Sequence, residues 1–392
     1  MNRTQRSVRT ASLLLLLVLF TVFLASAAPQ SGKYLVYVGT YTNDEGSKSK
    51  GIYAYRYDAA TAQLTSLGLA AETTNPSFVA VHPNGKFLYA VNELGNYKGP
   101  NSGGVSAFAI DHTTGKLTFL NELPSRGADP CYITVDRTGK YVLVANYTGG
   151  SVAVFPVHKD GRLGEPSEVV QHQGHGTDPK RQEGPHAHSI DLSPDNRFAF
   201  VDDLGLDELL IHRFDATRGD LTTDNPPFVF DPGTGPRHFA LHPNGNFAYV
   251  IGEMQGTVTV LQRVQKVVFF EKVQTVSTLP AGNKGEKEDA EIAVHRSGKF
   301  LYASNRGDGN SIAVFAIDDS RGTLTLVEYA STQGKTPRSF EIDPTGTLLF
   351  AANQKSDTIV IFKIDQTTGK LTPTGQVLDV PTPVCVKFVA LN

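Results

Sequence analysis

The sequence predicts an all-β fold, a seven-bladed β-propeller whose ring is closed by a blade built from both ends of the chain. Three observations predict it: a hairpin motif recurs six times at intervals of roughly 50 residues, two further short β-runs follow each copy, and a seventh copy is divided between the two ends. The six copies begin at Pro76, Pro130, Ala187, Pro236, Asp289 and Pro337. Four short strands in each repeat are typical of a propeller blade.

Within each copy the elements follow one order. Residues 76–93 read PSFVAVHPNGKFLYAVNE, in which two alternating apolar runs flank an Asn-Gly turn and so predict a hairpin. A third run such as SVAVFPV (151–157) or SIAVFAID (311–318) comes next. The fourth strand begins at a Gly-x-Leu segment such as Gly322-Thr323-Leu324.

The seventh copy is split. Residues 34–40, 51–58 and 62–67 match the second, third and fourth strands, and residues 383–388 (PVCVKF) match the missing first strand. Pairing of the two termini in one blade would leave no open sheet edge, which otherwise invites aggregation. We therefore expect a single domain over residues 31–392.

Composition agrees with this class and excludes others. The 392 residues are 40% hydrophobic with a net charge of -3, which excludes a disordered chain. The absence of Trp argues against WD40 repeats, whose signature includes that residue. A pI near 6.4 gives no basic surface for nucleic acid.

The first 28 residues have the pattern of a signal peptide. Arg3, Arg6 and Arg9 precede an apolar run over residues 13–24, and the small residues 25–28 then fit a peptidase site. The run is too short to span a bilayer as a stable helix. We expect cleavage, no stable membrane anchor afterwards, and an exported monomer in the periplasm or outside the cell.

Export would permit a disulfide between Cys131 and Cys385. The repeat alignment places the two residues on innermost strands two blades apart, too far for a bridge. We expect two buried thiols.

Alignment of the copies lets each position be followed around the ring. The residue after the first position of each copy faces the channel mouth; this ring contains Ser77, Cys131, His188, Arg237, Ala290, Arg338 and Val384. Two positions further on, alternation predicts an apolar ring deeper in the channel, made of Val79, Ile133, Ile190, Phe239, Ile292, Phe340 and Val386. The ends of the second strands bring Glu93, Asn146, Glu253 and Arg306 to the same mouth, and His186 and His238 lie at the entrances of adjacent blades.

The exceptions in these rings are candidate functional residues. Other copies carry Ser, Cys, Ala or Val where His188, Arg237 and Arg338 stand, so the fold alone does not require these three. For His186, His238 and Glu253 the pattern leaves a structural and a functional role open. The Asn residues at strand ends, Asn146 among them, are also explained by turn chemistry, and Glu93 by a solvated rim position. His82, His242 and His295 fall in hairpin turns, where we expect surface residues.

At these residues the chain resembles the seven-bladed lactonase family that includes the propeller-type 6-phosphogluconolactonase and the carboxy-cis,cis-muconate cyclase. The resemblance rests on YVGTYT (37–42), GPHAHS (184–189), DLGLDELLIHRFD (203–215), GTGPRHFALHPNG (233–245), SNRG (304–307), TPRSFEIDPTG (336–346) and PTPVCVKF (381–388). It implies opening or closing of a lactone ring without a metal. It also implies catalytic roles for His188, Arg237, Glu253 and Arg338, with Arg306 as an alternative to Arg338.

This chemistry suits the residues. His188 or Glu253 could act as the general base that activates water, and His188 is favoured. Arg237 and Arg338 could bind a carboxylate or phosphate and stabilise an oxyanion, while His186, His238, Arg306, Asn146 and Glu93 are candidates for substrate binding.

Three alternatives stay open at this point. No cofactor is expected, but a calcium-dependent lactonase could use Glu93, Asn146, Asp203 and Glu253. An exported propeller that only binds a small ligand or partner is another interpretation. The lactone substrate itself is either phosphorylated or free.

Overall fold

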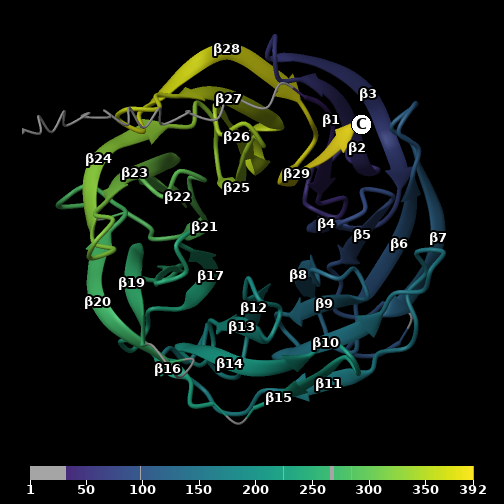
Figure 1. Cartoon of the computed structure of the whole chain (residues 1–392), viewed down its shortest axis with the longest axis horizontal. Helices are drawn as coiled ribbons and strands as arrows, with labels where there is room; N and C mark the ends of the chain where they lie inside the picture. The colour runs from purple at the N-terminus through teal and green to yellow at the C-terminus, as the bar shows by residue number, and fades with distance from the viewer. Residues whose placement is uncertain (1–31, 98, 224, 265–268, 284, 392) are drawn as a thin grey trace, which may run out of the picture.

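The computed structural model describes residues 32–391 apart from residues 98, 224, 265–268 and 284, so the signal peptide predicted at 1–28 lies outside the described residues. Seven antiparallel sheets stand around a central channel (Figure 1). Within each sheet the first strand of the repeat lies innermost. The prediction of a seven-bladed, all-β propeller is confirmed.

Every blade has its strands in the same order from the channel outward. Blade 1 contains β29 (Pro383–Leu391), β1 (Lys33–Thr40), β2 (Gly51–Asp58) and β3 (Gln63–Glu72). Blade 2 contains β4 (Val79–Val81), β5 (Phe87–Asn92), β6 (Gly104–Ile110) and β7 (Leu117–Pro124). Blade 3 contains β8 (Pro130–Val135), β9 (Tyr141–Asn146), β10 (Ser151–Pro156) and β11 (Glu168–Gln171). Blade 4 contains β12 (Ala187–Leu192), β13 (Phe198–Asp203), β14 (Glu208–Asp215) and β15 (Asp220–Thr222), with β16 (Phe228–Val229) also paired to β14.

The last three blades follow the same order. Blade 5 contains β17 (Pro236–Leu241), β18 (Phe247–Gly252), β19 (Thr257–Val264) and β20 (Phe269–Ser277). Blade 6 contains β21 (Asp289–Val294), β22 (Phe300–Asn305), β23 (Ser311–Ile317) and β24 (Leu324–Ser331). Blade 7 contains β25 (Pro337–Ile342), β26 (Leu348–Asn353), β27 (Thr358–Ile364) and β28 (Leu371–Asp379), with one turn of 3-10 helix, η1 (Gln354–Ser356). Within the described residues no helix is long and apolar enough to cross a membrane.

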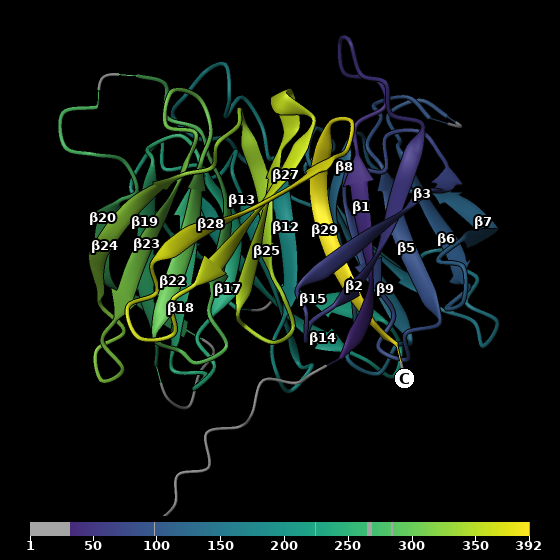
Figure 2. The same ribbon diagram turned by 90° about the horizontal axis from the view of Figure 1, so that it is seen from above.

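The two ends of the chain close the ring. β29 pairs with β1 in antiparallel register from Lys33 opposite Leu391 to Thr40 opposite Pro383. Figures 1 and 2 show the yellow C-terminal strand beside the purple N-terminal strand. The predicted split blade is confirmed, because the first strand of blade 1 comes from the far end of the sequence.

Neighbouring blades are joined by repeated hydrogen bonds at their hairpin turns. The imidazole Nε2 atoms of three histidines lie 2.8–2.9 Å from glycine carbonyls in the next blade; the pairs are His82–Gly139, His242–Gly298 and His295–Gly346. Gly298 is in the left-handed region at φ 73°, and a Cβ there would lie 2.8 Å from His242 Nε2. His242 and His295 are buried, so the expectation of surface residues is wrong for both.

The inner strands are irregular where they start. Register with the second strand shifts between Pro130 and Tyr132, Ala187 and Ser189, Pro236 and His238, Asp289 and Ile292, and Pro337 and Ser339. A β-bulge adds one residue to one strand and thereby reverses the face on which later side chains lie. The residues expected in a deep apolar ring instead pack in the hydrophobic cores that join the blades. The prediction of an apolar plug in the channel is therefore wrong.

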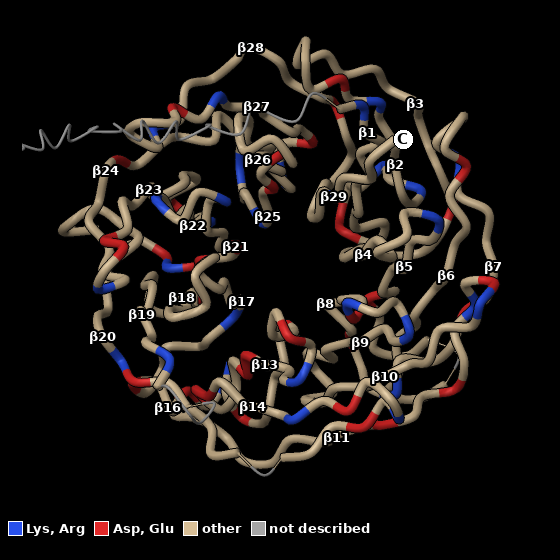
Figure 3. The backbone as a smooth tube through the Cα atoms, in the orientation of Figure 1, with Lys and Arg blue, Asp and Glu red and all other residues tan. Residues whose placement is uncertain are grey.

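Polar and aromatic side chains fill the channel instead. Tyr132 on blade 3 and Phe78 on blade 2 meet His238 on blade 5, with ring centroids 5.1 and 6.1 Å from that of His238. Charged side chains pair between inner strands: Lys387 binds Glu341 at 2.6 Å. Figure 3 shows such charged positions on the inner ends of the blades as well as around the outside of the ring.

The two cysteines are free and buried, as expected. Cys385 lies on β29 of blade 1 and Cys131 on β8 of blade 3.

Candidate active site

A cavity of about 290 Å³ opens at the end of the channel where inner strands begin and second strands end. It is lined by Glu93, Cys131, Tyr147, Arg181, His188, Glu253, Glu288, Arg306 and Arg338. The repeat alignment thus correctly brings together five of the predicted residues, His188, Glu253, Arg338, Arg306 and Glu93. Arg237 and His238 lie next to it, around an adjoining pocket of about 10 Å³ that shares Glu93, Cys131 and Arg338 with the cavity.

Glu253 is the centre of an arginine cluster. Its Oε2 atom accepts from Arg237 Nε at 2.9 Å and lies 3.0 Å from Arg306 Nη2, while its Oε1 atom accepts from Arg181 Nη2 at 2.5 Å. Burial by itself would raise the pKa of this carboxyl, but Arg306, Arg237 and Arg181 together lower it to about 2. Glu253 is therefore a stable anion that orients three arginines. Its low pKa also makes it a weak proton acceptor.

Arg237 is held by three hydrogen bonds from two of its guanidinium nitrogens. Only 2% exposed, it donates from Nη1 to the Ala290 carbonyl at 2.7 Å and to His238 Nε2 at 3.1 Å, in addition to its bond to Glu253. Burial and the neighbouring arginines lower its pKa to about 10, which leaves it charged at neutral pH. Because Nε and Nη1 bond within the protein, Arg237 is held beside the cavity rather than among its lining residues.

His238 extends this series of hydrogen bonds from Arg237 to Glu291. Its Nε2 accepts from Arg237, so its proton sits on Nδ1, which donates to Glu291 Oε1 at 2.9 Å. Burial lowers the pKa of His238 to about 4 even though Glu291 acts in the opposite direction. His238 is thus a neutral wall of the site, and the structure places it outside the cavity where substrate binding was predicted for it.

His188 faces the cavity as a neutral imidazole. Burial, then the charges of Arg237 and Arg338, hold its pKa well below the usual value. Its Nδ1 lies 3.8 Å from Cys131 Sγ, and its ring meets those of Tyr147 and His238 edge-on. Among the described residues Nε2 has no hydrogen-bond partner, so this atom is available to water or substrate.

Arg338 differs from the other arginines. Its guanidinium lies over the Tyr41 ring, 5.3 Å from the centroid, and no hydrogen bond or ion pair of this group occurs within the described residues. Tyr41 donates to Glu93, whose pKa is raised by burial although Arg338 opposes this. Arg338 is therefore a charged donor with free N–H groups at the cavity wall.

Two predicted substrate-binding residues have other partners. Asn146 is fully buried and donates from Nδ2 to the Ser125 carbonyl and to Ser151 Oγ. It joins β9 to β10 and to the connection between β7 and β8, and it does not line the cavity, so the structure favours the alternative of a structural residue. His186 stacks on Tyr147 at 4.6 Å between centroids and bonds through Nδ1 to the Tyr147 carbonyl. His186 therefore helps to hold Tyr147 in position.

The sequence pattern did not point to Arg181, Tyr147 or Glu288 as functional residues, and it placed Cys131 at the mouth without assigning it a role. Tyr147 follows Asn146 at the end of a second strand, and Cys131 belongs to the same ring of positions as His188. The alignment therefore places both at the mouth, but neither residue type marked it as functional. Arg181 lies in the segment between β11 and β12, where the repeat has no aligned position. No periodic signal could have identified it.

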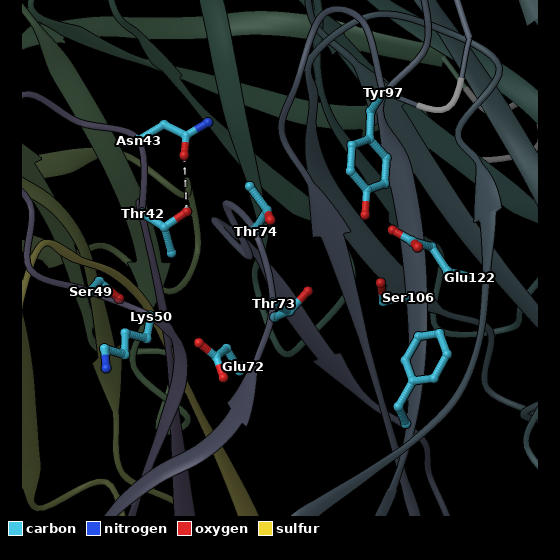
Figure 4. Close-up of a pocket in the computed structure, with 11 residues that line it drawn as sticks. Thr42, Asn43, Ser49, Lys50, Glu72, Thr73, Thr74, Tyr97, Ser106 and Glu122 are labelled. Carbon is cyan, nitrogen blue, oxygen red and sulfur yellow. Dashed lines mark hydrogen bonds between the residues drawn. The ribbon is translucent and has the colours of Figure 1, made fainter.

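A larger cleft of about 540 Å³ lies between blades 1 and 2. Figure 4 shows Tyr97 and Glu122 on one wall and Thr42, Asn43 and Lys50 on the other. Its lining residues include neither His nor Arg. The central cavity is the better candidate because it combines a neutral imidazole with free and oriented guanidinium groups.

Two carboxylates that could imitate part of a calcium site, Asp203 and Glu253, are held by other partners. Asp203 accepts from the His186, Gly205 and Leu206 amides through Oδ1 and lies 2.6 Å from His172 Nδ1 through Oδ2. Glu253 is bound within the arginine cluster, and the buried Asn146 Oδ1 atom has no hydrogen-bond partner among the described residues but does not line the cavity. In the described part of the chain no three His, Cys, Asp or Glu side chains are grouped so as to hold a metal ion.

Comparison with known proteins identifies the family. Residues 35–388 match the family of seven-bladed β-propeller lactonases. The 6-phosphogluconolactonase of Bacillus subtilis is 39% identical over 357 residues, which cover 91% of this chain and 99% of that protein. The 6-phosphogluconolactonase of Formosa agariphila is 35% identical over 343 residues, covering 86% and 94%. The solved structure of the periplasmic gluconolactonase of Pseudomonas aeruginosa is 34% identical with a TM-score of 0.85, covering 92% of this chain and all of that one. The chain therefore belongs to the lactonase family of seven-bladed β-propellers, and with it to the hydrolases of carboxylic esters.

Proposed function

We propose that this protein hydrolyses the lactone of a sugar acid in the central cavity, with water as the nucleophile, His188 as general base and no metal. One observation carries the proposal: a neutral imidazole with a free Nε2 and a guanidinium with free N–H groups, that of Arg338, line the same cavity. The relatives named 6-phosphogluconolactonase and gluconolactonase support a sugar lactone as the substrate class.

The reaction requires three proton and charge movements. His188 Nε2 removes a proton from water as the water oxygen attacks the lactone carbonyl carbon. Arg338 and Arg306 stabilise the negative charge that develops on the carbonyl oxygen. When the ring C–O bond breaks, the imidazolium returns its proton to the leaving alkoxide, which gives the open hydroxy acid and neutral His188.

The arginines control the protonation of His188. Without substrate they oppose a positive charge on His188 and keep it neutral, hence ready to accept a proton. In the transition state the oxyanion offsets their charge, so the imidazolium becomes less unfavourable when it forms. Glu253, ionised by its three arginines, serves as the fixed counter-charge of the cluster and not as the base.

The test compares wild type, His188→Ala and His158→Ala, an exposed histidine on blade 3 distant from the cavity, with gluconolactone and 6-phosphogluconolactone. We expect EDTA-resistant hydrolysis of at least one lactone by wild type and by His158→Ala, and its loss in His188→Ala, with unchanged thermal unfolding as evidence of folding. Loss of activity with EDTA and its recovery with Ca²⁺ would favour the calcium-dependent alternative. Binding of gluconolactone without turnover would favour a binding protein.

We also propose that the mature protein is exported as a monomer after removal of residues 1–28. The charged and apolar pattern of that segment supports export, as does the relative whose name calls it periplasmic. Cell fractionation with N-terminal sequencing of the mature chain tests this, and light scattering tests the monomer.

A further inference from the structure

We propose that Arg181 is a specificity-determining residue that binds an anionic substituent, phosphate or carboxylate, on the end of the sugar lactone farthest from the reacting carbonyl. This inference rests on the proposed function and specifies its substrate class.

The four arginines of the site differ in how many of their guanidinium N–H groups are bound within the protein. Arg237 is held by Glu253, Ala290 and His238. Arg306 is held almost as tightly, because it donates to the Glu288 and Asp289 carbonyls at 3.3 and 3.2 Å and pairs with Glu253. Arg338 has free N–H groups and is half-buried, and it lines both the cavity and the adjoining small pocket.

Arg181 combines access with free donors. Its side chain is 40% exposed, and its hydrogen bonds within the described residues all come from Nη2, to Glu253 Oε1 at 2.5 Å and to Tyr147 Oη at 3.3 Å. Nε and Nη1 have no partner among the described residues. These two nitrogens can each donate to an anion, and because Nη2 belongs to both forked edges of the guanidinium, two oxygens of one phosphate or carboxylate are bound when Nη2 turns from Glu253.

The loop that carries Arg181 is ordered by its own hydrogen bonds. Gln182 is buried; its Oε1 accepts from the Thr177 and Asp178 amides, and its Nε2 donates to the Leu204 carbonyl at 2.9 Å. Asp178 Oδ1 in turn accepts from the Arg181 amide at 3.1 Å. The Arg181 backbone is therefore held in place before a substrate arrives, which lowers the entropic cost of binding.

The cavity has two chemically different ends. His188 and Cys131 are buried at the inner end, where the carbonyl must lie if His188 is to deliver water to it. Arg181 is on the exposed side of the same cavity. A lactone whose carbonyl points inward therefore directs the outer side of its ring, from which the hydroxymethyl arm of a hexose can extend, toward Arg181.

Arg181 can bind a ligand without dismantling the site. If its guanidinium turns from Glu253 to an anion, Arg237 and Arg306 still pair with Oε2 of that carboxylate. Glu288 lines the same cavity and would repel an anion there. The two residues thus act in opposite directions on substrate choice.

The experiment measures kcat/KM for three lactones, namely 6-phosphogluconolactone, the lactone of glucaric acid and uncharged gluconolactone. The proteins are wild type, Arg181→Gln, Glu288→Gln and a control, Arg126→Gln, whose arginine is exposed and pairs with Glu165 on the surface. Arg181→Gln should lower the ratio of kcat/KM for an anionic lactone to that for gluconolactone by about tenfold or more, mainly through KM. Glu288→Gln should raise this ratio, and Arg126→Gln should leave it unchanged.

The outcomes separate the sources of the anion. A fall confined to 6-phosphogluconolactone assigns a phosphate, a fall confined to the glucaric lactone assigns a carboxylate, and a fall for both assigns anions in general. An equal loss for all three lactones, or an unchanged ratio, would overturn the role of Arg181.

Failure of the proposed function would look different, because wild type would then hydrolyse none of the lactones. Calorimetric binding of 6-phosphogluconate and glucarate to wild type and Arg181→Gln still tests the inference in that case. Equal affinity of the two proteins for both compounds would refute it.

Discussion

Replacement of Glu253 by Gln tests the charge cluster under the site. The change keeps the size of the side chain but removes the only carboxylate that pairs with Arg237, which is 2% exposed, within the described residues. A pKa lowered from 4.5 to about 2 corresponds to about 3 kcal/mol of stability at neutral pH. Removing one partner of a buried ion pair typically costs about 3–5 kcal/mol, which agrees with that figure.

The sign of the pH dependence follows from the lowered pKa. The contribution of Glu253 is complete above its unfolded pKa of about 4.5 and is lost as the pH falls toward 2, because the unfolded chain binds a proton at this carboxyl before the folded protein does. Glu253→Gln has no group that titrates at this position. The stability difference between wild type and Glu253→Gln should therefore be about 3 kcal/mol at pH 7 and shrink steadily below pH 4.5.

Urea unfolding of both proteins at several pH values from 7 to 3 measures this difference. Glu165→Gln, which breaks the exposed ion pair with Arg126, is the matched control and should cost less than about 1 kcal/mol at any pH. Equal stability of wild type and Glu253→Gln at pH 7, or a difference that does not change with pH, would refute the assignment of Glu253 as the ionised centre of the cluster.

Four further predictions follow from the same structure. Arg237→Lys should lower kcat/KM for the preferred lactone tenfold or more, because one ammonium cannot replace donors to Glu253, Ala290 and His238 together; full activity would contradict the role of Arg237. Cys131→Ala should keep kcat within about threefold, because burial raises the pKa of this thiol, which donates to the His188 carbonyl; a larger loss would show that the sulfur takes part in the reaction. Removal of residues 383–392 deletes β29 and exposes the edge of β1, so the protein should become protease-sensitive or aggregate; a protease-resistant product would refute the closure of the ring by these residues. Because the pKa of His188 lies well below its usual value of about 6.5, the acid limb of kcat/KM should fall below pH 6.5, and a limb at or above that value would argue against His188 as the base.

The fold could be predicted almost entirely from the sequence. Each blade needs its own alternating runs and turn, so the motif beginning at Pro76 reappears wherever the chain starts a new blade. The N-terminal copy of the repeat lacks a first strand, residues 383–388 supply one, and β29 confirms that assignment. The prediction of which side chains face the channel was wrong because of the bulges near Pro130, Ala187 and Pro236. A one-residue insertion reverses the face of every later side chain, and the alternating sequence pattern does not reveal it.

The site could be predicted in part. His188 and Arg338 stand out because a repeat reveals residues that differ from their counterparts, and both line the cavity. Arg237 stands out equally, yet in the structure its Nε and Nη1 bond within the protein and it does not line the cavity. Arg181 lies in a connection without counterparts, so comparison between blades says nothing about it.

The sequence by itself therefore determined the seven blades, the joined termini and the end of the channel that carries the unusual His and Arg residues. These properties are periodic, and a repeated pattern records them. Only the tertiary structure decided which guanidinium is free, which carboxylate is ionised and which imidazole is open to substrate. Hydrogen bonds and burial set these properties, and they arise between residues of different blades, such as Glu253 with Arg181 and Arg306, that no single repeat contains.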